Sequence, residues 1–155
     1  MSVDSEAFTL DTNVLVYAID TDAGVRHELA KQIIPAAAAC DCLMTLQAIL
    51  EFYAVCTRKG LMPRADAAAQ ALDWLELFPC GVASPAAARA ALADAVAGRA
   101  SYWDALLVAT AAGFGCTLIL SEDMADGAVL GGVESHNPFD PAGGLTERTR
   151  RLLEL

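Results

Sequence analysis

The sequence predicts an α/β domain of three layers, in which a short, mainly parallel sheet lies between two layers of helices. Short apolar stretches of strand length alternate with longer stretches of helical length, a pattern typical of parallel sheets. The chain has 155 residues, and 55% of them are hydrophobic, which is enough to bury the core of one domain. We therefore expect a single domain over residues 1–155, with a core at about 7–140 and a C-terminal tail at 141–155 that could be helical.

The first half of the chain alternates candidate strands with candidate helices. The strands are expected at 7–10 and 42–45, and the helices at 14–19, 26–39 and 46–59. Pro35 could break or kink the second of these helices, because proline lacks an amide hydrogen. Gly60 and Pro63 would end the third.

The second half is richer in helix. Helices are expected at 64–78, 85–97 and 101–113, a connector or strand at 79–83, a strand at 117–120, a last edge strand at 131–137 and a terminal helix at 146–155. The stretch 101–113 has small or apolar residues on every side and should be buried. The apolar side of the helix at 64–78 would consist of Ala68, Ala71, Leu72, Leu75 and Phe78.

Composition limits the classes of function. The formal net charge is −10, which argues against a strong nucleic-acid binder unless a local basic patch or a bound cation is present. No apolar run approaches the roughly 18 residues of a membrane span, and the acidic N-terminus lacks the basic start of a signal peptide. We expect a cytoplasmic protein whose five cysteines are reduced thiols.

Four acidic residues stand where predicted strands end or predicted helices begin. Asp11 and Asp123 directly follow strands, and Asp104 lies in the first turn of the helix before the strand at 117–120. Glu51 could reach the same place from the helix after the second strand. Because the C-terminal ends of parallel strands share one edge of a sheet, these residues, hereafter the four acids, are expected to converge.

Each of these positions also has a purely structural explanation. Asp104 would complete a capping box with Ser101, and its charge suits the positive end of the helix dipole. Residues 11–12 could simply cap the next helix. Glu51 could belong to a solvated helix face with Gln47.

Convergence of the four acids would favour a metal site. Two carboxylates about 4 Å apart repel by roughly 4 kcal/mol at an effective dielectric constant near 20. A hard divalent cation such as Mg²⁺ or Mn²⁺ removes this cost. Bound metal can lower the pKa of a water and stabilise the charge that develops on a phosphodiester, so no His, Ser or Cys nucleophile is needed.

Other chemistries find less support. His27 and His136 are not at metal-ligand spacing, and Cys40 and Cys42 form an isolated C-x-C. No P-loop or G-x-G-x-x-G is present, so a nucleotide cofactor is not expected. A phosphoryl-accepting aspartate would also follow a first strand, but the second acid of a D-x-D motif is replaced here by Asn13.

Four segments, in order, resemble the motifs of PIN-domain nucleases, and especially of the VapC-type toxins of bacterial toxin–antitoxin pairs. They are LDTNVLVYA at 10–18, QAILEFY at 47–53, YWDALLVA at 102–109 and LSEDMADG at 120–127. The segment 137–139, NPF, also resembles the end of that domain. The resemblance covers roughly residues 7–140 and includes all four acids, and it implies a three-layer α/β/α PIN fold.

The resemblance also implies residue roles. Asp11 and Asp104 would be the principal ligands of Mg²⁺ or Mn²⁺, and Glu51 and Asp123 would complete the acidic pocket. Three polar residues would support the site or contact phosphate, namely Thr12, Asn13 and Ser121. An RNA-facing basic patch would consist of Arg58, Lys59 and Arg64. Asp126 is left outside the site as a helix cap.

We therefore expect a metal-dependent endoribonuclease that acts as the toxin of a type II toxin–antitoxin pair. Members of this family are commonly homodimers, inhibited by a cognate antitoxin protein whose tail lies in the active-site groove. Two alternatives remain open, a housekeeping RNA-processing nuclease without an antitoxin, and a catalytically silent binding module whose acids are only caps.

Overall fold

The computed structural model describes residues 5–155, so the first four residues of the expected domain lie outside the described part. Within it, the strands are β1 (Phe8–Leu10), β2 (Met44–Thr45), β3 (Cys80–Gly81), β4 (Leu118–Leu120), β5 (Val129–Leu130) and β6 (Val133–His136). The helices are α1 (Thr12–Tyr17), α2 (Val25–Ala38), α3 (Leu46–Arg58), α4 (Arg64–Leu77), α5 (Pro85–Val96), α6 (Tyr102–Gly113) and α7 (Glu147–Leu153), and a short 3₁₀ turn spans Thr21–Ala23.

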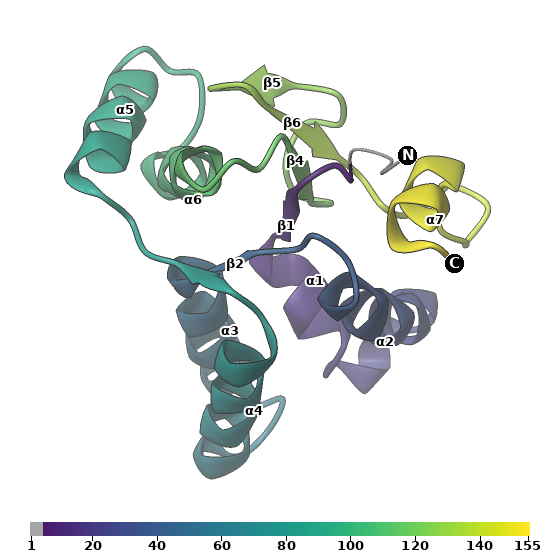
Figure 1. Ribbon diagram of the computed structural model, residues 1–155. Coiled ribbons are helices and arrows are strands. Elements are labelled where there is room, and N and C mark those ends of the chain that lie inside the picture. Colours follow the sequence, from purple (N-terminus) through teal and green to yellow (C-terminus); the bar gives the residue numbers. More distant parts are fainter. Residues whose placement is uncertain (1–4) are drawn as a thin grey trace.

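The strands form the mainly parallel sheet that the sequence predicts. Their order is β1-β4-β6-β5, and only β5 runs antiparallel to its neighbour. A parallel bridge between Phe8 and Cys42 places the β2–β3 pair on the other side of β1. The α5–α6 pair lies to one side of the strands and helices α1 to α4 lie to the other, so the α/β/α prediction is confirmed (Figure 1).

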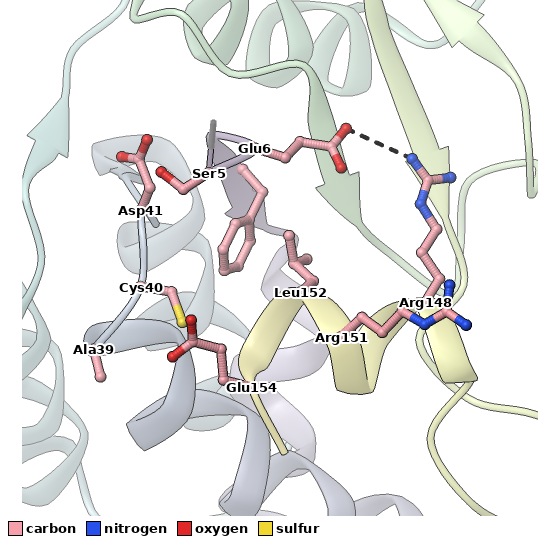
Figure 2. A pocket seen from close by; sticks show the side chains of 10 residues that line it. Ser5, Glu6, Ala39, Cys40, Asp41, Arg148, Arg151, Leu152 and Glu154 are labelled. Carbon is pink, nitrogen blue, oxygen red and sulfur yellow. Dashed lines mark ion pairs between the residues drawn. The ribbon is translucent and has the colours of Figure 1, made fainter. Parts of the chain in front are cut away.

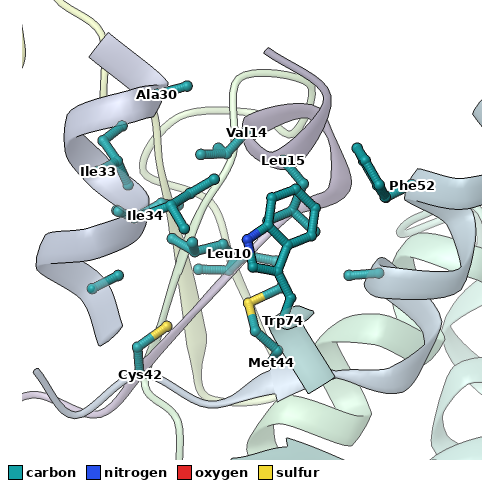
Figure 3. Close-up of a cluster of buried hydrophobic side chains, with 14 of the residues drawn as sticks. Leu10, Val14, Leu15, Ala30, Ile33, Ile34, Cys42, Met44, Phe52 and Trp74 are labelled. Carbon is teal, nitrogen blue, oxygen red and sulfur yellow. The ribbon is translucent and has the colours of Figure 1, made fainter. Parts of the chain in front are cut away.

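Strand β1 lies at the centre of the molecule. Its three residues are fully buried, because β4 and the segment leading into β2 flank it and helices cover it. Leu10 belongs to one large cluster with apolar side chains of α1, α2 and β2 (Figure 3). A strand this deeply buried fixes the position of whatever follows it in the chain, which here is Asp11.

The packing of α4 corrects one prediction. Leu72, expected on the apolar side, is 60% exposed, whereas Trp74 is buried and meets Phe52 of α3 edge to face, with the ring centroids 4.6 Å apart. The buried face follows Ala67, Ala71 and Trp74 at helical spacing. A tryptophan buries more apolar area than a leucine, so it decides which of two overlapping stripes faces the core.

The sequence analysis expected the last strand, at 131–137, to lie at an edge of the sheet, and this expectation is wrong. Strand β5 pairs outside β6, and the two are joined by Gly131 and Gly132. Both glycines have positive φ, 57° and 82°, which a tight two-residue hairpin turn requires and glycine adopts without strain. The expected break at Pro35 is also absent, because α2 continues through it to Ala38.

The C-terminal tail contains α7, which packs on the rest of the protein. Thr146 caps the helix by accepting a hydrogen bond from the amide of Thr149, and both Thr149 and Leu153 are buried. Arg148 pairs with Glu134 of β6. No helix among residues 5–155 is long and apolar enough to cross a membrane.

Candidate active site

The four acids line one cavity of about 350 Å³ beside the C-terminal ends of β1 and β4, as the sequence predicted. They come from four different places in the chain: the end of β1, the middle of α3, the first turn of α6 and the loop after β4. The remaining lining residues are Thr12, Asn13, Val16, Tyr17, Val55, Arg58 and Lys59. The fold thus brings together side chains that are up to 112 positions apart in sequence.

Asp11 is the most buried of the four acids, with 7% of its surface exposed. Its backbone amide donates to the carbonyl of Leu120, which ties it to β4. One carboxylate oxygen accepts from the amide of Thr12 at 2.7 Å, which caps α1, and the other accepts from the hydroxyl of Ser121 at 2.6 Å. Asp11 is therefore both a helix cap and a wall of the cavity.

The surroundings of Asp11 change its ionisation. The pKa of Asp11 is raised from 3.8 to about 6, mainly by burial and to a smaller extent by the negative charges of Asp104 and Asp123. The hydrogen bonds from Ser121 and Thr12 oppose this change without cancelling it. At neutral pH the carboxylate therefore carries a charge that its surroundings disfavour, and a bound cation would stabilise that charge.

Glu51 is not part of a solvated helix face. One of its carboxylate oxygens accepts from the hydroxyl of Thr12 at 3.0 Å, and the other accepts from the amide of Gln47 at 3.0 Å. The same amide nitrogen donates to the carbonyl of Trp103 at 2.9 Å, which links α3 to the start of α6. Two polar contacts thus hold the Glu51 carboxylate in the cavity.

Asp104 lies at the capped start of a helix and also lines the cavity. Ser101 caps α6 by accepting from the amide of Asp104 at 3.2 Å, as its sequence pattern indicates. The carboxylate of Asp104 nevertheless lines the cavity. Burial raises its pKa, the hydroxyl of Ser101 lowers it, and the charges of Glu51 and Asp123 raise it.

Asp123 lies on an exposed loop. Contacts of the residues before and after Asp123 hold this loop in place. The Ser121 hydroxyl, which donates to Asp11, also accepts from the amide of Met124 at 3.2 Å. The neighbouring carboxylate of Glu122 accepts from Tyr17 at 2.7 Å and pairs with Arg26 at 2.6 Å. Sequence analysis missed this last group, because residues about 100 positions apart give no local signal of their pairing.

Asn13 lines the cavity, and its side chain has unused hydrogen-bonding capacity. Both polar atoms of its side chain are buried, and neither has a hydrogen-bond partner in the described part of the chain. Leaving a buried polar group without a partner costs about 1–3 kcal/mol. A ligand that enters the cavity could supply the missing partner.

The predicted basic patch is divided by the structure. Arg58 and Lys59, at the end of α3, line the cavity, whereas Arg64, at the start of α4, does not. Asp126 is not a helix cap, because the chain runs from it into a turn and then into β5. Its carboxylate accepts from the backbone amide of Asn137 at 2.8 Å and fastens the loop between β4 and β5.

The donor set suits a hard divalent cation. Within residues 5–155, no three His, Cys, Asp or Glu side chains already meet around a common point where a metal could lie. The four acids instead surround an open space. Mg²⁺ fits such a space, because it keeps several of its waters and is commonly bound through only one or two carboxylates. The buried charge of Asp11 and the unpartnered amide of Asn13 are consistent with a polar ligand there.

A larger cavity, about 460 Å³, lies elsewhere. It is lined by residues before and within β1, after α2 and on α7, and it contains an ion pair between Glu6 and Arg148 at 3.6 Å (Figure 2). It adjoins Phe8, at the opposite end of β1 from Asp11. None of the four acids lines it, so its greater size does not make it the candidate active site.

Comparison with known proteins identifies relatives of this fold. The family model for the PIN domain matches residues 8–125. VapC20 of Mycobacterium tuberculosis, described as a sarcin-ricin loop cleaving toxin, has 18% identity and a TM-score of 0.59, over 76% of this chain and 92% of that one. A toxin–antitoxin complex from Klebsiella pneumoniae has 22% identity and a TM-score of 0.55, over 82% of this chain and 95% of that one. At these identities the structural likeness shows the fold alone. No curated protein sequence gives a significant match.

The ionisation of Asp11 can be tested through stability. A carboxyl whose pKa is raised on folding stabilises the protein fully below about pH 3.8, and this contribution is lost as pH rises through about 6. In buffer with EDTA, we expect Asp11→Asn to be more stable than wild type at pH 7.5, by up to about 3 kcal/mol in urea unfolding. The difference should shrink as pH falls toward 4.

The matched control is Asp73→Asn, at an exposed position of α4. It should change the free energy of unfolding by less than about 0.5 kcal/mol at either pH. A wild-type protein more stable than Asp11→Asn at pH 7.5, with no dependence on pH, would contradict this view of the site.

Proposed function

Because the chain belongs to the PIN-domain family, we propose that it is a metal-dependent endoribonuclease that acts as the toxin of a toxin–antitoxin pair. The observation that carries this proposal is the lining of one cavity by all four acids. Of the two structural neighbours, one is described as cleaving an RNA loop and the other is a complex of a toxin with its antitoxin. Both support the proposal.

The four acids would hold Mg²⁺ or Mn²⁺, which when bound lowers the pKa of a water and stabilises charge on a phosphodiester. Neighbouring polar residues would orient these carboxylates. Ser121 and the amide of Thr12 each hold one oxygen of Asp11. The hydroxyl of Thr12 holds one oxygen of Glu51, so truncation of this side chain would remove one of the two hydrogen bonds that position the Glu51 carboxylate.

Arg58, Lys59 and Asn13 would serve the substrate. The two cations lie at the end of α3 on the wall of the cavity, and they offset locally the net charge of −10. Phosphate contacts of this kind supply most of the sequence-independent affinity for a nucleic acid. The free amide of Asn13 can donate to a phosphate oxygen.

Several parts of the proposal depend on the family resemblance. These are the cognate antitoxin, the homodimer and action in the cytoplasm. The whole chain would form one domain, and the packing of α7 on the remainder supports this. A nuclease without an antitoxin would share the same site chemistry, and only an antitoxin that binds and inhibits the protein would distinguish the two.

The direct test is cleavage of total RNA by the purified protein, with Mg²⁺ and with EDTA. We expect cleavage only with the metal, and a loss of at least about 100-fold in Asp104→Asn, which keeps the size and the cap but removes a ligand charge. Asp73→Asn, outside the cavity, should cleave like wild type.

The outcomes separate the alternatives. Metal-independent cleavage, or equal cleavage by Asp104→Asn and wild type, would show that the site is assigned wrongly. A folded wild-type protein that binds RNA but never cleaves it, with any divalent metal, would favour a silent binding module.

Charge reversal tests the basic wall of the cavity. Arg58→Glu combined with Lys59→Glu should weaken RNA binding and flatten its dependence on salt. The slope of log affinity against log salt should fall by about 1 for each phosphate that the variant no longer neutralises. Fluorescence anisotropy over a range of salt concentrations measures both effects.

Two single reversals complete the comparison. Arg89→Glu, at an exposed position of α5, is the control and should leave the slope unchanged. Arg64→Glu tests the third residue of the predicted patch, which does not line the cavity, and we expect a smaller effect than at Arg58. Unchanged binding in the double variant would remove Arg58 and Lys59 from the substrate path.

A further inference from the structure

We propose that a second, smaller cavity beside the four acids binds a single nucleobase of the RNA, next to the phosphate that is cut. This inference rests on the proposed function and adds to it a binding site for a flanking nucleotide. The cavity measures about 210 Å³. That volume corresponds to about seven waters in the liquid, which is room for one heterocyclic base.

The position of this cavity links it to the site. Asp104 and Asp123 line both the acidic cavity and the small one. These two residues therefore form the boundary between them, with Arg58 and Lys59 on one side and the small cavity on the other. A strand whose phosphate lies against the acids would bring its next base to the mouth of the small cavity. The base in the small cavity would thus belong to the same RNA strand as the phosphate at the four acids.

The walls suit the face of a base. They are formed mainly by apolar side chains of α6, of the loop after β4 and of β5, namely Val108, Met124, Ala125, Ala128 and Leu130. Bases of single-stranded RNA bind to proteins largely through their faces, most often by stacking on aromatic side chains. Although no aromatic side chain of residues 5–155 lines the cavity, the thioether of Met124 can contact a ring favourably.

One buried polar group can read the edge of that base. Ser135 of β6 is only 7% exposed, and its hydroxyl lies 3.5 Å from the sulfur of Met124, its one side-chain partner in the described residues. Sulfur is a weak acceptor, so the hydroxyl has hydrogen-bonding capacity in reserve. A base could take the place of the sulfur as its partner.

Arg99 completes the chemistry at the rim. Its guanidinium pairs with Asp94 at 3.0 Å, but the side chain is 63% exposed, so this pair is weak. A guanidinium keeps further donors for a second phosphate. Basic side chains thus occur beyond the acids on both sides, Arg58 and Lys59 in one direction and Arg99 in the other. This charge pattern favours an RNA strand over a protein segment as the occupant.

The test combines a variant that fills the small cavity with RNA substrates that lack one base. Ala128 is exposed at the rim, so Ala128→Phe should occupy the cavity without disturbing the core, which thermal unfolding checks. The main cut site of wild type is first mapped on a mixed RNA. Cleavage is then compared on RNAs that lack one base on either side of the cut.

We expect wild type to lose at least about fivefold in kcat/KM when the base on one particular side is missing. Ala128→Phe should be slower on intact RNA and should not distinguish it from the RNA without that base. Ser135→Ala, which changes one atom, should alter the preference among bases at that position by about two- to tenfold.

Ala90→Phe is the matched control. Ala90 is also an exposed alanine and lines a different cavity, of about 250 Å³ between α5 and α6, which contains none of the four acids. This variant should behave like wild type on every RNA.

The results separate this proposal from the function on which it rests. If wild type neither binds nor cuts RNA, both are overturned. If wild type cuts RNA and Ala128→Phe keeps the same rate and base preference, only the base site is overturned. If Ala128→Phe cuts normally but an inhibitory antitoxin no longer binds, the cavity accepts a protein side chain and the base site is wrong.

Discussion

The structure depends on the placement of one carboxylate, that of Asp11, at the end of the fully buried strand β1. The strand is held on both sides, because β4 pairs with it on one side and the segment before β2 pairs with it on the other. Ser121, at the end of β4, reaches across to hold the same carboxylate. The pairing of β1 with β4 and the geometry of the site are therefore set by the same contacts. Burial then makes the charged form of Asp11 costly, and a bound cation would offset this cost.

The other acids are positioned by interactions that are common throughout proteins. A helix cap places Asp104, and side-chain hydrogen bonds place Glu51. The loop with Asp123 is held through its neighbour Glu122, on which Tyr17 and Arg26 converge, while Arg26 also lies over the ring of Phe139 at 5.5 Å. The same residues thus hold the local structure and line the cavity. A cap and a ligand are not competing explanations of an acid at a helix start.

Much of this site could be predicted from the sequence. The C-terminal ends of parallel strands share one edge of a sheet, whatever the side-chain packing around them. This rule placed Asp11 and Asp123 together although 112 positions separate them. The predictions that were wrong or missing depend on contacts with residues that are distant in the sequence. Leu72 and Trp74 belong to overlapping stripes, and only the contact with Phe52 decides between them. The role of Asp126 depends on the amide of Asn137, and that of Glu122 on Tyr17. The β5–β6 hairpin did have a signal, two glycines between the apolar residues Leu130 and Val133, and it could have been found.

The central claim is that the four acids form a site for a divalent cation, and Mn²⁺ can be located directly by its anomalous X-ray scattering. Crystals of the wild-type protein and of Asp11→Asn would be soaked in millimolar Mn²⁺. We predict a strong peak in the cavity between Asp11, Glu51, Asp104 and Asp123 in the wild type, and a weaker peak or none in the variant. A wild-type cavity with no peak, or a peak of equal strength in both proteins, would contradict the claim.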